Sequence, residues 1–527
     1  MKIVLVHVRD PQFYAIPGRR RAKNGRIQVM GFPPIGIMTL SAVLKRAGHD
    51  VVLFDQANPE TPDEVIVAEV GRRQPDLVGL SFLSTTSYPY AKLLARTLRA
   101  TQATGKLAFG GVFASLNAER IKRQVPEVDF VCRGDGEQLI LDLLDHLDDP
   151  AAVAGVTWQT QDGTVRHNPD RPLDRNLDQW PFPDRESLAL DFVESMPLDV
   201  PVVLSRQRFT TMQTSRGCPW PCVFCDIPVF SEGKWRQRSP AHVLAEMQQL
   251  ERDGYGSVYF VDDHFLLQPR RIEAICQGVE AKGLTIQWGC EGRVDSTCIG
   301  LFPAMAKAHC RTLMFGVESG SQKILDRLKK GQTLAQTETA VSSAKRAGIE
   351  IVHGFFVVGN PDETDADMRE TFRFASRLRL DTFAFNRLCV YRGTPLWKEY
   401  LERGLVHDEA DWYKYFKCSS IDPTVLPGET IHRIRSQELR RLIVYKLFHY
   451  PGQALRLLSR LARNMPLRDI VHLIMKPFLG DARGPTKAEV LSRAIEHGVL
   501  KSAAADMTQV PDEALMRMLA PPVAERA

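Results

Sequence analysis

Cysteines cluster at one point of this chain, in Ser215-Arg216-Gly217-Cys218-Pro219-Trp220-Pro221-Cys222-Val223-Phe224-Cys225-Asp226. The two prolines and the glycine of this stretch oppose a regular helix, so we expect the three thiols to share one irregular loop. Three thiolates on one loop suit a soft metal. A structural zinc would need a fourth cysteine or histidine nearby, and none follows at zinc-like spacing. Three cysteines that hold a [4Fe–4S] cluster instead leave one iron open to a ligand.

The other seven cysteines lie apart, mostly in apolar stretches, and we expect them to be small packing residues. A chain of 527 residues suggests about three domains. Its net charge of +5, from 68 basic and 63 acidic residues of interspersed sign, does not indicate a nucleic-acid partner. No apolar run reaches the ~18 residues of a membrane span, and the N-terminus has no signal-peptide layout. We therefore expect a cytoplasmic protein with reduced thiols.

Residues 1–150 alternate between strand-like and helical patterns, which is typical of a doubly wound, flavodoxin-like α/β sheet. Ligands of such sheets bind at the carboxyl ends of the strands. The loops at these ends hold small, hydroxyl and charged residues, which by themselves would be ordinary turn chemistry. The candidate binding residues among them are Ser84, Thr85, Gly110, Gly111, Gly134 and Glu137. The strand-like runs are Lys2–Val8, Val51–Asp55, Asp76–Phe82, Lys106–Gly111 and Asp129–Cys132.

Residues 206–420 contain six strand-like runs separated by helical patterns, which predicts a partial (β/α)6 barrel. Active sites of barrels gather at the carboxyl ends of the strands, and the cysteine loop follows the first run. The carboxylates of Asp262 and Asp263 follow the second run and could meet a cation, although Asp263 could instead cap a helix. The six runs are Phe209–Thr214, Ser257–Val261, Thr285–Cys290, Thr312–Val317, Glu350–Val358 and Thr382–Val390.

Two further segments complete the predicted organisation. Residues 151–205 are predicted as a linker, with a short hairpin around Asp162-Gly163 followed by a Pro-rich stretch. Residues 421–527 are predicted as a helical region whose tail frays after about Ser502. Arginines recur there among apolar residues, so we expect a solvated face and an apolar face packed on the barrel. The alternatives are a lid over the substrate and a helix at a membrane surface.

The Cys-x3-Cys-x2-Cys pattern, with Phe224 before its last cysteine, resembles the signature of radical S-adenosylmethionine (SAM) enzymes. This resemblance implies that Cys218, Cys222 and Cys225 ligate a [4Fe–4S] cluster whose open iron binds SAM, with Phe224 beside the cofactor. An external donor such as flavodoxin or ferredoxin would supply the electron that cleaves SAM to a 5′-deoxyadenosyl radical. The protein's share of such chemistry is to position the cofactor and to exclude side reactions.

The same resemblance implies SAM contacts after the later strands. Asp262 would face the SAM ammonium, and Arg293 would pair with its carboxylate. Glu318 and Ser319 would bond the ribose hydroxyls, although the same two residues could form a plain helix cap. Gly354 would lie on the strand that lines the adenine, where a glycine lets the backbone approach the ring.

Residues 1–150 resemble the cobalamin-binding domain that precedes many radical SAM cores, chiefly through Gly110-Gly111 and residues 133–137, Arg-Gly-Asp-Gly-Glu. The resemblance implies cobalamin contacts for the six candidates named above. Many cobalamin proteins place Asp-x-His-x-x-Gly after the first strand, but the loop that follows Val8 here has no such histidine. His7 lies in the strand itself, so we expect it to be packed. We expect a base-off cobalamin without a histidine ligand.

These resemblances favour a cobalamin-dependent radical enzyme that methylates an unactivated carbon of a small-molecule substrate, anionic or lipid-like. A non-methylating reaction, such as anaerobic tetrapyrrole ring cyclisation or ring contraction, shares the same motifs and stays open. A non-catalytic cobalamin sensor would need no cluster, so the cysteine loop counts against it. Methylthiotransferases carry a second cluster before the barrel, whereas residues 1–217 contain only Cys132.

Overall fold

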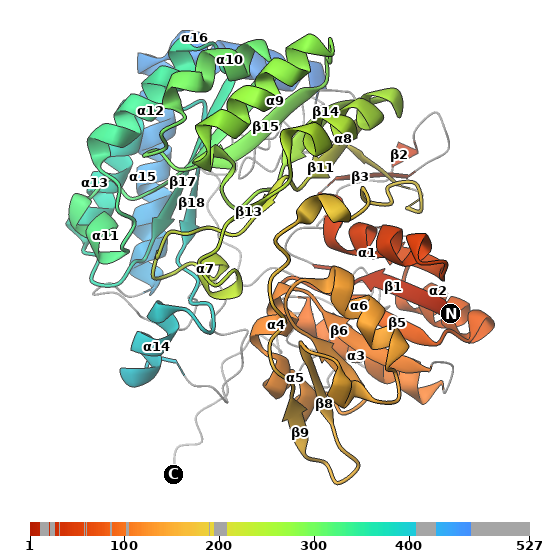
Figure 1. The fold of residues 1–527 in the computed structure, drawn as a ribbon. Coiled ribbons are helices and arrows are strands. Elements are labelled where there is room, and N and C mark those ends of the chain that lie inside the picture. Colours follow the sequence, from red (N-terminus) through yellow and green to blue (C-terminus); the bar gives the residue numbers. More distant parts are fainter. Residues whose placement is uncertain are drawn as a thin grey trace, which may run out of the picture. The chain divides into compact units, whose positions relative to one another are not determined.

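The computed structural model describes residues 1–10, 20–21, 27–30, 32–56, 58, 61–84, 87–101, 105–188, 190–193, 208–406 and 428–464. Within these residues the chain divides into two compact units. The first unit contains Met1–Asp174 and Trp180–Asp191, and the second contains Arg175–Gln179 and residues 192–464. Each unit is built around its own sheet, which is mostly parallel in the first unit and wholly parallel in the second (Figure 1).

The first unit is built on a seven-stranded sheet in the order β4-β1-β5-β6-β7-β8-β9. The first five strands of this order are parallel, and β8 and β9 are antiparallel. The parallel part has the flavodoxin-like order, which confirms the predicted fold class. The hairpin β8–β9, which falls in the predicted linker, pairs with β7 and extends this sheet. The strands are β1 (Lys2–His7), β4 (Asp50–Asp55), β5 (Leu77–Ser81), β6 (Lys106–Gly110), β7 (Phe130–Cys132), β8 (Val156–Gln159) and β9 (Val165–His167).

Helices cover both faces of this sheet. The chain turns from β1 to β4 in one direction and from β4 to β5 in the other, so right-handed crossovers place α1 and α2 on opposite faces. Helix α1 packs beside α6, and α2 packs beside α3. The helices are α1 (Ile35–Arg46), α2 (Asp63–Arg73), α3 (Tyr88–Ala100), α4 (Val112–Leu116), α5 (Ala118–Gln124) and α6 (Gly136–Asp145).

The second unit is built on a six-stranded sheet whose strands are all parallel and lie in chain order. This half-barrel confirms the predicted partial (β/α)6 barrel. Alternate side chains of the strands, such as Val258 and Phe260, join one apolar core with the surrounding helices. The strands are β11 (Arg208–Met212), β14 (Tyr255–Phe260), β15 (Gln287–Gly292), β16 (Cys310–Glu318), β17 (Ile351–Val358) and β18 (Thr382–Arg387).

Helices alternate with these strands on the outer side of the half-barrel (Figure 1). Two of them begin with reciprocal capping boxes, Thr333 with Gln336 and Thr364 with Asp367, which satisfy free amides of the first turn. The helices are α8 (Pro240–Arg252), α9 (Pro269–Ala281), α10 (Phe302–Lys307), α11 (Gln322–Arg327), α12 (Leu334–Arg346), α13 (Asp365–Arg377) and α14 (Pro395–Glu402).

Two C-terminal helices, α15 (Gly428–His449) and α16 (Pro451–Asn464), follow the half-barrel. Ile431, Ile434 and Leu442 of α15 are buried in the same core as the sheet. The predicted apolar face on the barrel is therefore confirmed, whereas the predicted frayed tail lies outside the described residues. None of the described helices combines the length and the apolar character that crossing a membrane requires.

Short elements complete the description of the chain. The strands are β2 (Arg20–Arg21), β3 (Ile27–Met30), β10 (Leu190–Val193), β12 (Ser215–Arg216) and β13 (Arg236–Gln237), with the short helix α7 (Ile227–Phe230). The 3-10 turns are η1 (Pro150–Ala152), η2 (Leu177–Gln179), η3 (Phe265–Leu267) and η4 (Ile299–Leu301).

Candidate active site

The cysteine loop leaves the carboxyl end of the half-barrel through the small antiparallel pair β12–β13. Its first residue, Gly217, has a φ of +87°, and a Cβ there would lie 2.1 Å from the carbonyl oxygen of Lys234. Only glycine fits this turn. The loop therefore turns sharply back over the strand ends, where barrel active sites form.

The middle of the loop is held by backbone bonds to two distant elements. The Val223 amide donates to the Leu328 carbonyl at 3.1 Å, and the Val223 carbonyl accepts from the Leu396 amide at 3.0 Å. The ring of Phe224 packs against apolar clusters on both sides. In this structure Phe224 thus anchors the loop, and its predicted place beside a cofactor stays a prediction.

The three thiols share a largely desolvated environment. Cys222 is buried, and Cys218 and Cys225 are half-buried. Burial raises the pKa of the Cys218 and Cys225 thiols, and the neighbouring Asp226 adds to the effect on Cys225. A [4Fe–4S] cluster binds each cysteine through a different iron, and the soft donor set of three thiols on one loop fits such a cluster.

The two carboxylates after β14 support the base of the loop. Asp262 is buried and accepts hydrogen bonds from the Thr214 amide at 2.5 Å and from the Ser215 hydroxyl at 2.6 Å. Asp263 accepts from the Gly217 amide at 2.7 Å. Burial raises the pKa of Asp263 to about 6. Sequence reasoning considered a SAM ammonium or a helix cap for this pair, and it missed the bonds to the loop.

Arg293 lies directly after β15 and faces the loop, as its position in the sequence suggested. Its Nε and Nη2 donate to Asp295 at 2.9 and 2.8 Å, and its Nη1 donates to the Cys222 sulfur at 3.7 Å. The guanidinium also lies over the Trp220 ring, 4.1 Å from its centroid. In this structure the Arg293 guanidinium therefore contacts protein groups. A bond from it to the SAM carboxylate stays a prediction.

An ion pair between the last residue of β16 and a later lysine went unnoticed in the sequence. Lys330 Nζ donates to Glu318 Oε1 at 2.8 Å, and both side chains are buried. Burial alone would lower the pKa of Lys330, but the Glu318 carboxylate and the Cys222 sulfur outweigh it and raise that pKa. Glu318 has a φ of +65°, which is rare for a residue other than glycine. No local pattern marks Lys330, whereas the spacing Arg-x-Asp could have indicated Asp295.

Two predicted SAM contacts are engaged elsewhere in this structure. Ser319 is fully buried, and its hydroxyl lies 3.0 Å from that of Thr371 and accepts from the Ser321 amide at 3.1 Å. A Cβ on Gly354 would lie 2.7 Å from Leu380 in the apolar core. The helix that follows, α11, has Ser321 as its N-cap residue, so the alternative of a plain helix cap at Ser319 is wrong. Gly354 makes room for core packing. Their contacts with ribose and adenine remain predictions.

The inner side of the sheet carries polar groups. The Tyr259 hydroxyl donates to Glu291 Oε1 at 2.7 Å, and His353 Nδ1 lies 2.9 Å from the Thr382 hydroxyl. Burial raises the pKa of Glu291. A substrate that enters the half-barrel would therefore meet hydrogen-bonding groups as well as apolar surface.

In the first unit, small residues line the carboxyl ends of β6 and β7. Around Gly110 and Gly134 no atom lies within 4 Å of where a Cβ would be, so the backbone is open to a ligand. Gly111 has a φ of +103°, and a Cβ there would lie 2.2 Å from the Phe82 carbonyl oxygen. A bare backbone surface of this kind fits the approach of a large cofactor such as cobalamin.

The other candidates of this unit differ in their surroundings. The Ser84 hydroxyl donates to the buried Asp10, which also accepts from Ser87 at 3.0 Å. Glu137 is buried in the first turn of α6, and Thr85 lies outside the described residues. His7 is buried with its Nδ1 2.9 Å from Asp55, which confirms a packed histidine.

Gly111→Ala is expected to destabilise the first unit by ~2 kcal/mol or more, because the residue must keep a backbone region that only glycine adopts readily. Denaturant unfolding of the apo-protein measures the loss. Gly110→Ala is the matched control, since its Cβ would meet nothing within 4 Å. Equal stability of the two variants would contradict the expectation.

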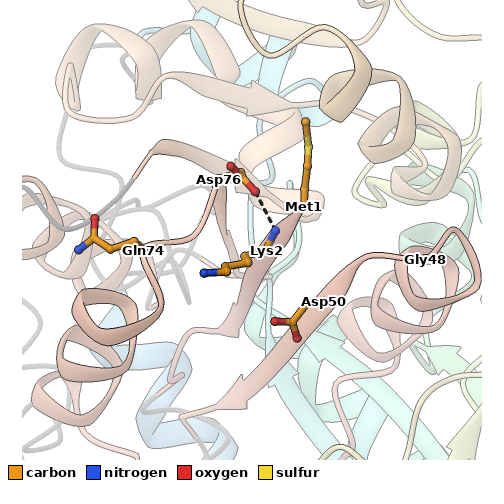
Figure 2. A pocket seen from close by; sticks show the side chains of 6 residues that line it. All are labelled: Met1, Lys2, Gly48, Asp50, Gln74 and Asp76. Atoms are coloured by element: carbon orange, nitrogen blue, oxygen red, sulfur yellow. Dashed lines mark hydrogen bonds between the residues drawn. The ribbon is translucent and has the colours of Figure 1, made fainter.

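A hollow also lies at the amino ends of β1, β4 and β5 in the first unit (Figure 2). The Lys2 amide at its centre donates to Asp76 at 2.7 Å. Because ligands of parallel sheets bind at the carboxyl ends, we assign no cofactor to this hollow. Its lining residues are Met1, Lys2, Gly48, Asp50, Gln74 and Asp76.

Two family models match this chain. The family model described as the radical SAM superfamily matches residues 212–375. The model described as the B12 binding domain matches residues 30–144. The first match begins just before the cysteine loop, and the second includes Gly110, Gly111 and Gly134.

Similar proteins span most of the chain. An uncharacterized methyltransferase of Pyrococcus horikoshii is 31% identical over 415 residues, covering 78% of this chain and 86% of the relative. The anaerobic magnesium-protoporphyrin IX monomethyl ester cyclase of Rubrivivax gelatinosus is 25% identical, covering 81% and 77%. The structure of the radical SAM methyltransferase TsrM from Kitasatospora setae, with cobalamin and a [4Fe–4S] cluster bound, has a TM-score of 0.62. It is 18% identical, covers 76% of this chain and 78% of its own, and shares the fold.

Proposed function

Because this chain belongs to the radical SAM enzymes that carry a cobalamin-binding domain, we propose that it methylates an unactivated carbon of a small-molecule substrate. The observation that carries the proposal is the loop of Cys218, Cys222 and Cys225 at the carboxyl end of a parallel half-barrel. When bound, a [4Fe–4S] cluster with SAM supplies a 5′-deoxyadenosyl radical, and cobalamin supplies the methyl group to be transferred. The similarity to a methyltransferase over most of the chain supports methylation.

The protein's own residues then have three tasks. The three cysteines hold the cluster, and the bonds of Val223 to Leu328 and Leu396 keep their loop in place. Polar groups at the strand ends, of which Asp262, Arg293, Glu318, Ser319 and Gly354 remain our candidates, orient SAM. The open backbone at Gly110 and Gly134, together with our candidates Ser84, Thr85, Gly111 and Glu137, holds cobalamin.

Substrate and partners are proposed more broadly. The polar inner face with Tyr259 and Glu291 favours a substrate that can form hydrogen bonds. Exposed arginines such as Arg456 on α16 suit an anionic or lipid-like molecule. A low-potential donor such as flavodoxin or ferredoxin would supply electrons. Ring cyclisation is the second candidate, since the similarity to the Rubrivivax gelatinosus cyclase extends over 81% of this chain.

Methyl-labelled SAM separates the two reactions. The reconstituted protein is incubated anaerobically with labelled SAM, a reductant, cobalamin and an extract of small molecules, and products are separated by mass. We expect label in a product together with 5′-deoxyadenosine. Formation of 5′-deoxyadenosine with no label in any product would contradict methylation and favour the cyclase.

A further inference from the structure

The arginine after β15 makes a contact that the proposed function does not use. Arg293 is buried, with 6% of its surface exposed, and its Nη1 donates to the sulfur of Cys222 at 3.7 Å. Cys222 is the most buried of the three loop cysteines. A charged donor therefore lies against a cluster ligand in a place that water barely reaches.

The surrounding residues fix this guanidinium in one orientation. Asp295 accepts from Nε and Nη2, the Lys330 carbonyl accepts a second bond from Nη2, and the Trp220 ring lies against one face. Together with the bond to Cys222, these contacts use all but one of the five N–H groups of an arginine. The orientation is thus built into the fold before any cofactor binds.

Lys330 adds a second positive charge on the same side. Its Nζ lies 2.8 Å from Glu318, and its backbone carbonyl accepts a hydrogen bond from Arg293. A Cβ on Gly316 would lie 2.6 Å from the Glu318 carboxylate and 3.0 Å from the Lys330 amine. A side chain at position 316 would therefore displace this ion pair.

We propose that Arg293, held by Asp295 and Trp220 and assisted by Lys330, raises the reduction potential of the cluster that Cys222 helps to hold. The inference rests on the proposed function, because it presupposes a cluster at these cysteines. Reduction adds one electron from a low-potential donor of the flavodoxin or ferredoxin class, and no bond forms or breaks. The added negative charge is stabilised by an N–H···S bond and by nearby cations, and such bonds to sulfur are known to set cluster potentials.

This role is distinct from binding the SAM carboxylate, and a measurement without SAM separates the two. The full-length protein is reconstituted anaerobically as wild type, Arg293→Met and Arg293→Lys. The midpoint potential of each is determined by a redox titration followed by electron paramagnetic resonance, with no SAM added. Arg369→Met is the matched control, because Arg369 pairs with Glu438 between α13 and α15, outside the cysteine loop.

We expect Arg293→Met to load a cluster. The midpoint potential of that cluster should be more negative than that of wild type. Arg293→Lys, which keeps the charge but loses the planar fork, should shift less in the same direction, and Arg369→Met should not shift. A loaded Arg293→Met with the wild-type potential, or a more positive one, would overturn the inference alone. If Arg293→Met does not load a cluster, the midpoint potential of Arg293→Lys is compared with wild type instead. A potential equal to that of wild type, or a more positive one, would overturn the inference.

Two further outcomes are decisive. Failure of both Arg293 variants to load, while wild type loads, would make this arginine a residue of cluster assembly and overturn its role in the potential. Failure of wild type to load would overturn the proposed function together with the inference. The midpoint potentials of the loaded variants therefore test the inference. Cluster loading in wild type tests the proposed function.

Discussion

Replacing Cys222 by alanine is expected to abolish reductive cleavage of SAM, with a loss of at least ~100-fold, since even outer partners of metal sites cost 10–100-fold when removed. Cys222 is the buried member of the three thiols and accepts the Arg293 bond. Without it the loop offers only two ligands. Two thiolates are too few to hold a cluster that keeps one open iron for SAM. The measurement is 5′-deoxyadenosine formed after anaerobic reconstitution and chemical reduction.

A buried cysteine away from the loop is the control. Cys276 on α9 lies in the apolar core, so Cys276→Ala removes a thiol of the same unit without touching the cluster site. We expect it to lower stability by about 1 kcal/mol and to keep full cluster absorbance. Cluster absorbance and SAM cleavage that survive in Cys222→Ala would show that the cluster is held elsewhere.

The second large effect concerns stability. Lys330→Met is expected to destabilise the apo-protein by ~3–5 kcal/mol, because it leaves the Glu318 carboxylate buried without its partner. Denaturant unfolding of the second unit measures the change. Adding Glu318→Gln to Lys330→Met removes the unpaired charge, so the double variant should recover most of the loss.

An exposed lysine gives the comparison for this effect. Lys307 pairs with Glu280 on the surface, where 73% of the lysine side chain is exposed. Lys307→Met should therefore change stability by less than ~1 kcal/mol. A Lys330→Met variant no less stable than Lys307→Met would show that the buried pair does not hold the end of β16.

Local patterns were sufficient to predict the architecture. The alternation of apolar strands and amphipathic helices predicted both parallel sheets, because each element must bury its apolar side against its neighbours. The cysteine loop followed from spacing and from its prolines, which act over a few residues. The positive φ of Gly217 and Gly111 also fits residues that had been singled out from the sequence.

Long-range contacts explain what the sequence did not reveal. The register shift between Gly316 and Glu318 in the β16–β17 pairing, and the positive φ of Glu318, turn this carboxylate toward Lys330. Asp262 meets Thr214 and Ser215 only because β11 and β14 are neighbours in the sheet. No periodicity in a single sequence encodes such pairs.

The central claim is that the cysteine loop of this chain supports radical cleavage of SAM. Its most direct test is 5′-deoxyadenosine produced by the anaerobically reconstituted full-length protein on one-electron chemical reduction with SAM. We predict 5′-deoxyadenosine in the wild type with a full cluster, and none in Cys222→Ala. A fully loaded wild type that forms no 5′-deoxyadenosine after reduction would contradict the account.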